Sequence, residues 1–327
     1  MRIRTIIWLI IAVLILAGST ILCALRWDVW FITPPEPAWN GDTLSTCFVT
    51  FNDSTTYTCQ TTDSVTMVVL GDVHNTLTHN DYLQIAALNP QMQCYAQLGD
   101  FVEREQFYYK QLLMRELNGT PFTSLPILAC PGNHEYSKGI NRRLPDSWFA
   151  SFPMPLNGPE DGLGTTYYVD FRNLRFIAID TEDSQLLSDF TRLNAWVKQT
   201  ISTAWQPWVV VMMHRPVFAS RKGRMNPTVW MSLAYALQEA DVIFSGHDHT
   251  YARRGDGLAE DGETHEPVWI GLTSTTHART PKTRSRMDTI VAGGPFYGQL
   301  QVSRHELSLR TCTLDGTCID SVKLVER

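Results

Sequence analysis

Side chains that can bind metals follow five stretches of the chain with the pattern of β-strands. They lie in Gly71-Asp72-Val73-His74, Gly99-Asp100, Gly132-Asn133-His134-Glu135, His214 and Gly246-His247-Asp248-His249. Carboxylate, amide and imidazole groups are the ligands that divalent transition metals take in proteins. A single such group is more often a turn residue or a helix cap. Five of the nine histidines fall at these five strand ends, and the joint pattern therefore predicts a metal site.

The elements that would position these donors alternate between strands and helices. Residues 65–70, 94–98 and 125–130 are short apolar runs typical of buried strands, and residues 81–88 and 103–117 between them favour helices. This β-α-β-α-β order implies parallel strands, whose carboxyl ends meet where α/β sites are normally built. A Gly before several of the donors permits a sharp turn and a close approach of the backbone.

The second half of the chain continues the alternation. A stretch rich in Gly, Pro and Asn over 135–165 predicts a long loop over the site. Further strands are expected at 167–171, 174–180, 208–213, 242–244, 268–272, 297–302, 307–312 and 318–324. Helices are expected at 188–200 and 228–239, the latter with Trp230, Leu233, Ala234 and Leu237 on one side.

The composition is that of a globular protein. The 327 residues are 44 % hydrophobic and 18 % charged, with a net charge of −6. No long basic run is present, so a broad nucleic-acid-binding surface is not expected.

The first segment departs from this average. Ile6 to Leu25 contains no charged side chain, and a helix of this length spans ~30 Å, the thickness of a bilayer's hydrocarbon core. Arg2 and Arg4 precede it, which favours a cytosolic N-terminus. A cleaved signal peptide is the alternative. Either interpretation sends the rest of the chain across a membrane, to the extracellular or lumenal side.

Three regions are therefore expected. Residues 1–30 form a cytosolic tip and a transmembrane signal anchor, residues 31–62 form a spacer with a small β appendage, and residues 63–327 form the main domain.

The cysteines agree with an oxidising compartment. Cys47 with Cys59, and Cys312 with Cys318, each flank a short stretch containing turn residues. Each pair predicts a disulfide that closes a hairpin, with reduced thiols as the alternative. Partners for Cys94 and Cys130 stay open. The sequons at Asn52 and Asn118 would be glycosylation sites in a eukaryotic secretory pathway.

The order of the donor motifs resembles the calcineurin-like metallophosphoesterase superfamily, from Val65 to about Tyr251. The segments around His214 and from Gly246 to Arg253 are most similar to its purple acid phosphatase-related branch. The resemblance implies an α/β fold, with a two-sheet β sandwich flanked by helices.

The resemblance also implies two metal ions, which would be divalent or mixed-valence Fe, Mn or Zn. One would be held by Asp72, His74, Asp100 and His249. The other would be held by Asp100, Asn133, His214 and His247, with Asp100 as a bridge. The purple enzymes carry an iron-binding Tyr where this chain has Glu103, and they lack a residue equivalent to His74. These departures argue against a ferric tyrosinate site.

A hydroxide shared by two such ions would attack phosphorus. His134 would protonate the leaving group or stabilise its charge, and Glu135 could orient His134. Because Gly99 to Arg104 is similar to a Ser/Thr phosphatase motif, Arg104 is a candidate phosphate contact. The leading prediction is hydrolysis of phosphate monoesters outside the cytosol. The alternatives are cleavage of a diester, a pyrophosphate or a phospholipid headgroup at the same site, and a binding domain without activity.

Overall fold

A computed structural model describes residues 48–50, 57–59, 64–104, 107–138, 142–221, 226–257, 265–280 and 286–326. The predicted anchor, most of the spacer, Cys47, the side chain of Cys59 and the sequon at Asn52 lie outside these residues. Within them, no helix combines the length and the apolar character that a bilayer crossing needs.

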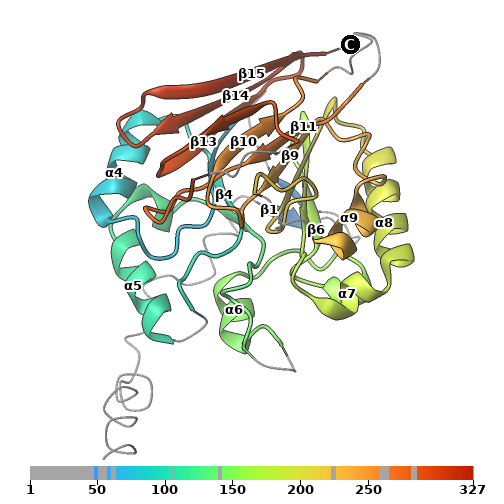
Figure 1. The fold of residues 1–327 in the computed structure, drawn as a ribbon, viewed down its shortest axis with the longest axis horizontal. Helices are drawn as coiled ribbons and strands as arrows, with labels where there is room; N and C mark the ends of the chain where they lie inside the picture. The colour runs from blue at the N-terminus through green and yellow to red at the C-terminus, as the bar shows by residue number, and fades with distance from the viewer. Residues whose placement is uncertain are drawn as a thin grey trace, which may run out of the picture.

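Two mixed β-sheets pack against each other (Figure 1). The six-stranded sheet has the order β15-β14-β13-β3-β4-β5. Its strands are β3 (Val65–Leu70), β4 (Cys94–Gln97), β5 (Ile127–Ala129), β13 (Phe296–Val302), β14 (Glu306–Thr313) and β15 (Cys318–Val325). The nine-stranded sheet has the order β1-β2-β6-β7-β8-β9-β11-β10-β12. Its strands are β1 (Phe48–Thr50), β2 (Tyr57–Cys59), β6 (Tyr167–Asp170), β7 (Leu174–Ile179), β8 (Trp208–Met213), β9 (Val242–Ser245), β10 (Tyr251–Arg254), β11 (Val268–Gly271) and β12 (Thr289–Val291).

The parallel strands predicted from the sequence are present. Strands β3, β4 and β5 pair in parallel, and helices α4 (His79–Leu88) and α5 (Phe107–Leu117) connect them. Strands β7, β8, β9 and β11 are also parallel. The two-sheet sandwich flanked by helices is therefore confirmed, and the carboxyl ends of both parallel sets are available for a site.

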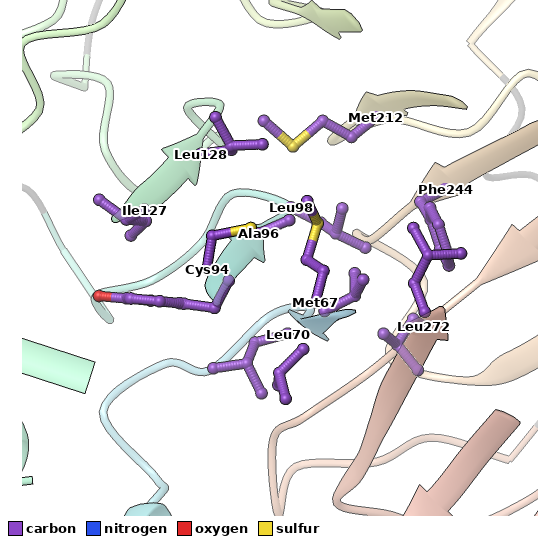
Figure 2. Close-up of a cluster of buried hydrophobic side chains, with 14 of the residues drawn as sticks. Met67, Leu70, Cys94, Ala96, Leu98, Ile127, Leu128, Met212, Phe244 and Leu272 are labelled. Carbon is purple, nitrogen blue, oxygen red and sulfur yellow. The ribbon is translucent and has the colours of Figure 1, made fainter. Parts of the chain in front are cut away.

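Alternate side chains of the parallel strands β7, β8, β9 and β11 enter different cores, as strand geometry requires. In β8, Val210 and Met212 face the core between the sheets, where Figure 2 shows Met212 and Phe244 of one sheet with Leu128 of the other. Val209, Val211 and Met213 pack in a second core. Helices α7 (Ser184–Ser188), α8 (Phe190–Ser202) and α9 (Pro227–Leu233) complete this second core, on the side opposite α4 and α5 (Figure 1).

Some predicted boundaries were wrong. The helix expected over 228–239 ends at Leu233, and residues 234–239 form turns that still bury Leu237. Trp230 is 41 % exposed rather than on the buried side, because the packed face carries Val229 and Leu233. The expected loop over 135–165 contains helix α6 (Asp146–Ser151) and a 3₁₀ turn at Glu160–Gly162, and another 3₁₀ turn covers Pro121–Thr123. Strands β10 and β12 were not predicted.

The edges of the sheets hold the remaining predicted features. Strand β2 pairs with β1 and joins β6, so this hairpin extends the nine-stranded sheet.

Cys312 and Cys318 are register partners in the β14–β15 hairpin, beside an irregularity at Thr311 and Cys312. Both thiols are free. The predicted bridge is thus absent from the structure, although the two strands bring its cysteines opposite each other. Cys94 and Cys130 are buried, and neither forms a disulfide.

Candidate metal centre

All five donor motifs lie at the carboxyl ends of strands, and they come from both sheets. Strands β3, β4 and β5 lead into Asp72 with His74, Asp100, and Asn133 with His134. Strands β8 and β9 of the other sheet lead into His214 and into His247 with His249. The site therefore lies where the ends of two facing sheets meet.

Four of the predicted ligands form a first donor group, consisting of Asp72, His74, Asp100 and His249. The Nε2 atoms of His74 and His249 are 3.1 Å apart. His249 Nε2 lies 3.6 Å from Asp72 Oδ1, and His74 Nε2 lies 3.5 Å from Asp100 Oδ2. All four ligand atoms lie within 4.8 Å of one another, which is the spacing that ligands around one ion require.

A second donor group consists of Asp100, Asn133, His214 and His247. Three of these residues converge within 4.8 Å. His214 Nε2 lies 3.3 Å from Asp100 Oδ2, 3.4 Å from Asn133 Oδ1 and 3.2 Å from His247 Nδ1. Asp100 Oδ2 therefore faces both groups, so the structure brings all seven predicted ligands together.

Neighbouring groups orient the imidazole rings. Nδ1 of His214 donates a hydrogen bond of 2.9 Å to the Leu98 carbonyl, and Nδ1 of His249 donates one of 3.3 Å to the His277 carbonyl. In both rings Nε2 is left facing the site. Fixing the second ring nitrogen in this way is how proteins set the orientation of a metal-binding histidine.

His74 has a charged neighbour instead of a carbonyl. Its Nδ1 lies 3.1 Å from Glu103 Oε2, without the geometry of a hydrogen bond. Glu103 is the residue that stands where purple enzymes have their Tyr, and here its carboxylate lies beside a ligand of the first donor group.

The backbone around the donors is held in unusual conformations. Five of the seven ligand residues, Asp72, His74, Asp100, His247 and His249, have φ between 48° and 70°. Non-glycine residues rarely adopt the left-handed region, and such strain gathers at functional sites.

Close approach also explains two of the glycines. A Cβ on Gly99, whose φ is +87°, would lie 2.6 Å from Gly132 N and 2.7 Å from His214 Nδ1. A Cβ on Gly132 would lie 2.3 Å from Asp100 N. Only glycine lets these two loops meet at this distance.

Burial and neighbouring charges shift the pKa values of the histidines in different directions. Burial, together with the other histidines, lowers the pKa of His74 to about 3, although Asp100 opposes the shift. Burial also lowers the pKa of His249 to about 4. Neutral imidazoles have the lone pair that a metal ligand needs.

In the second donor group the neighbouring carboxylates shift the pKa of His214 in the opposite direction. Burial would lower the pKa of His214, but Asp100 and Asp72 outweigh it and raise the pKa to about 10. Burial would raise the pKa of Asp100, but the charge and hydrogen bond of His214 lower it well below its usual range. Burial raises the pKa of Asp72.

His134 is more exposed than the ligands that surround it. Its side chain is 28 % exposed, whereas that of His214 is 0 % exposed. The backbone N–H of His134 donates to Asp100 Oδ1 at 2.8 Å, its Nδ1 donates to the Glu103 carbonyl, and its Nε2 lies 3.9 Å from Asp100 Oδ2. Nε2 is therefore available to a molecule in the site. Glu135 does not contact the ring, because its carboxylate binds backbone N–H groups instead.

A cavity of about 630 Å³ opens over the donors. It is lined by His74, Asp100, Glu103, Asn133, His134, Tyr136, Ser137, Lys138, Arg142, Arg215, His247, His249, His277 and Arg279. Arg104, the predicted phosphate contact, is exposed and is not among these residues. Four other cationic residues, Lys138, Arg142, Arg215 and Arg279, line the cavity and were not predicted.

Glu182 was also missed. Its side chain is fully buried and binds both Arg142 and Arg215. One signal was available, because the strand 174–180 also ends in acidic residues, Asp180 and Glu182, as the donor strands do.

Comparison with known proteins agrees with this architecture. A sequence model of calcineurin-like phosphoesterases matches residues 65–251, which is more than half of the chain. Mouse acid phosphatase type 7 is 25 % identical over 153 residues, which cover 40 % of this chain and 33 % of that protein. The chain thus matches about a third of the length of this curated relative.

Solved structures share the fold. Purple acid phosphatase PPD1 of yellow lupin superposes with a TM-score of 0.64 and 16 % identity, covering 83 % of this chain and 56 % of that one. GAP50, described as the anchor in the inner membrane complex of Plasmodium, superposes with a TM-score of 0.54 and 16 % identity. The match covers 81 % of this chain and 89 % of that one. Similarity to purple acid phosphatases, predicted from the motifs, is therefore found by sequence and by structure.

Proposed function

Because the chain belongs to the calcineurin-like phosphoesterase family, we propose that it is a binuclear metallophosphatase that hydrolyses phosphate monoesters. The position of Asp100 carries this proposal. Its Oδ2 lies 3.5 Å from His74 Nε2 and 3.3 Å from His214 Nε2, between the two donor groups. A carboxylate in that position is suited to bridge two ions.

The donors fit the ions that the family implies. Two carboxylates, one amide and four imidazoles are a mixed oxygen and nitrogen set, which suits Fe, Mn or Zn. The first donor group would hold one ion and the second donor group the other. When bound, two such ions lower the pKa of water and offset negative charge on phosphate oxygen atoms.

Two arginines are placed to bind the phosphate group, in place of Arg104. Arg215 Nη1 lies 3.0 Å from His247 Nε2, which puts its guanidinium beside the second donor group. The carboxylate of Glu182 binds Nε of Arg215 at 2.6 Å and Nη2 of Arg215 at 2.9 Å. The same carboxylate binds Nη2 of Arg142 at 3.1 Å. Since one buried carboxylate is shared by two guanidinium groups, a positive charge remains to bind an anion.

His134 completes the reaction in this proposal. Its Nδ1 donates to the Glu103 carbonyl, and this bond is compatible with the doubly protonated ring. Nε2 would then donate a proton to the leaving oxygen as the bond from phosphorus breaks.

The apolar segment from Ile6 to Leu25 supports a location outside the cytosol. We infer a lumenal or extracellular catalytic domain, anchored by that segment, with glycosylation at Asn118 if the host cell glycosylates. Asn118 is exposed at the end of α5. Glycosidase treatment of cell lysates, and protease treatment of intact cells and of sealed microsomes, test this location. An extracellular domain is cleaved on intact cells, a lumenal domain is protected in microsomes, and a cytosolic domain is cleaved on microsomes and carries no glycan. In an oxidising compartment, the opposed Cys312 and Cys318 would form their bridge.

The activity is tested on the full chain purified in detergent. p-Nitrophenyl phosphate and bis-p-nitrophenyl phosphate are assayed from about pH 4 to about pH 9, after stripping of metal and after reloading with Mn, Zn or Fe. Asp100→Asn is the test variant. Glu306→Gln, which removes a surface carboxylate of β14, is the control.

The proposal expects metal-dependent hydrolysis of the monoester, which is lost in Asp100→Asn and kept in Glu306→Gln. Faster cleavage of the diester than of the monoester would show that the protein is a phosphodiesterase instead. A folded protein that binds two ions and cleaves neither ester would favour a binding domain. A chain that binds no metal would refute the whole proposal.

A further inference from the structure

The wall of the cavity carries more positive charge than one phosphate group needs. Lys138 and Arg142 come from the segment after β5, Arg215 from the turn after β8, and Arg279 from the segment after β11. Only two acidic residues, Asp100 and Glu103, line the same cavity in the part of the chain that the structure describes. Asp100 is committed to the donor groups, and Glu103 lies beside His74.

The four cations fall into two pairs. Arg142 and Arg215 are tied to the buried Glu182 and are thereby fixed beside the second donor group. Lys138 and Arg279 are exposed, and neither side chain has an acidic partner among residues 64–104, 107–138, 142–221, 226–257, 265–280 and 286–326. The second pair is therefore available to a ligand that extends from the metal centre toward solvent.

The cavity has little to offer an apolar group. Among its described lining residues no side chain is aliphatic, and Tyr136, the one phenol, donates its hydroxyl hydrogen bond to Asp180 at 2.6 Å. Small-molecule sites are ordinarily lined mostly by hydrophobic and aromatic side chains, in volumes of ~300–1,000 Å³. This cavity, at about 630 Å³, has the volume of such a site but a charged wall.

We propose that the substrate is a small, hydrophilic phosphate monoester that carries a second phosphate group on its leaving part. This inference rests on the proposed phosphatase function and names its substrate class. Arg142 and Arg215 bind the phosphate group that is removed, and Lys138 and Arg279 bind the one that stays. Water supplies the oxygen that bonds to phosphorus, the bond from phosphorus to the ester oxygen breaks, and one proton passes to that oxygen. The products are inorganic phosphate and a monophosphate.

The test compares two sugar esters of equal chemistry at the scissile bond, fructose 6-phosphate and fructose 1,6-bisphosphate. The full chain, loaded with the metal that supports hydrolysis of p-nitrophenyl phosphate, is assayed for kcat/KM on both. The proposal expects a preference for the bisphosphate of about tenfold or more, because two further cations attract the second phosphate group. The preference falls as salt is added, since exposed charges are screened.

A double variant assigns the preference to the proposed residues. Lys138→Met with Arg279→Met is expected to reduce the bisphosphate preference to about twofold or less. Arg304→Met, which removes one exposed cation from the β13–β14 turn at the far end of the strands, is expected to keep it.

The outcomes separate the two proposals. Equal kcat/KM for the two sugar esters, in a wild-type protein that hydrolyses p-nitrophenyl phosphate, overturns the inference and leaves the phosphatase standing. So does a preference that survives in the double variant. No hydrolysis of any of the three esters by the metal-loaded protein contradicts the phosphatase itself.

Discussion

The carboxylate of Glu135 accepts a hydrogen bond of 2.8 Å from the backbone N–H of Asp100, the residue that faces both donor groups. The same carboxylate accepts from the N–H groups of Phe101, Val102 and Gly132 at 2.7, 3.1 and 2.7 Å. Glu135 is 4 % exposed, so these bonds lie away from water. One buried side chain therefore joins the loop after β4 to the loop after β5.

Glu135→Gln should loosen that junction. The glutamine amide keeps one acceptor oxygen and turns an NH₂ group toward N–H donors, which leaves buried donors unpaired. We expect a loss of about 2–4 kcal/mol in the free energy of unfolding and weaker metal retention. Urea unfolding and metal analysis of Glu135→Gln beside Glu306→Gln measure both. Unchanged stability in Glu135→Gln would mean that the four bonds contribute little.

Glu103→Gln tests the charge beside His74. The substitution keeps the size of the side chain and removes the negative charge 3.1 Å from His74 Nδ1. Carboxylates next to a ligand histidine raise its basicity, and their loss typically weakens metal binding ~10–100-fold. We expect the loss to affect one ion of the pair, because His74 belongs to the first donor group and not to the second. A metal titration that shows two unchanged affinities would assign Glu103 no part in the centre.

Asp180 should make stability depend on pH. Burial raises the pKa of this carboxyl from 3.8 to about 6, although hydrogen bonds from Tyr136 and Glu182 oppose the shift. A raised pKa means that the folded state binds the proton more tightly than the unfolded state. Its stabilising contribution is therefore full below pH 3.8 and is lost as pH rises through about 6.

Asp180→Asn removes this dependence while the amide oxygen can still accept from the Glu182 N–H. The free energy of unfolding of the wild type, measured relative to Asp180→Asn, should fall by about 2–3 kcal/mol between about pH 4 and about pH 7. Urea unfolding of both proteins across this range gives the difference. A difference that stays constant would show that the buried carboxyl keeps its ordinary pKa.

Much of the site was accessible from the sequence because its ligands follow strands directly. Asp72, Asp100 and His214 lie within three residues of the end of a strand. Short apolar runs that end in Gly-Asp or His identify such positions without tertiary information. The parallel order of β3, β4 and β5 was predictable for the same reason.

The substrate-facing groups were not accessible in this way. Arg142 and Lys138 lie in irregular segments, and only the position of Glu182 after β7, next to β8 in the sheet, shows that it reaches Arg215. The end of α9 likewise depends on which side chains the second core accepts. These features follow from contacts between segments distant in sequence, which periodicity does not report.

Substituting Gly99 by Ala has two effects, a steric clash with neighbouring atoms and strain from the left-handed backbone. Gly119→Ala is a matched control, because it introduces the strain without the clash. The two glycines have similar left-handed φ values, +87° and +75°, but a Cβ at Gly119 meets no atom within 4 Å. Gly119→Ala should therefore lose only the ~1–2 kcal/mol that a side chain costs in this conformation, and should keep its metals. At Gly99 the new Cβ would lie 2.7 Å from His214 Nδ1 and 2.6 Å from Gly132 N, so the loops after β4 and β5 must separate and His214 must move. We expect Gly99→Ala to lose several-fold more activity and metal than Gly119→Ala at comparable folded content. Equal losses in the two variants would mean that glycine is required at position 99 only because of its φ value, and not because of close packing.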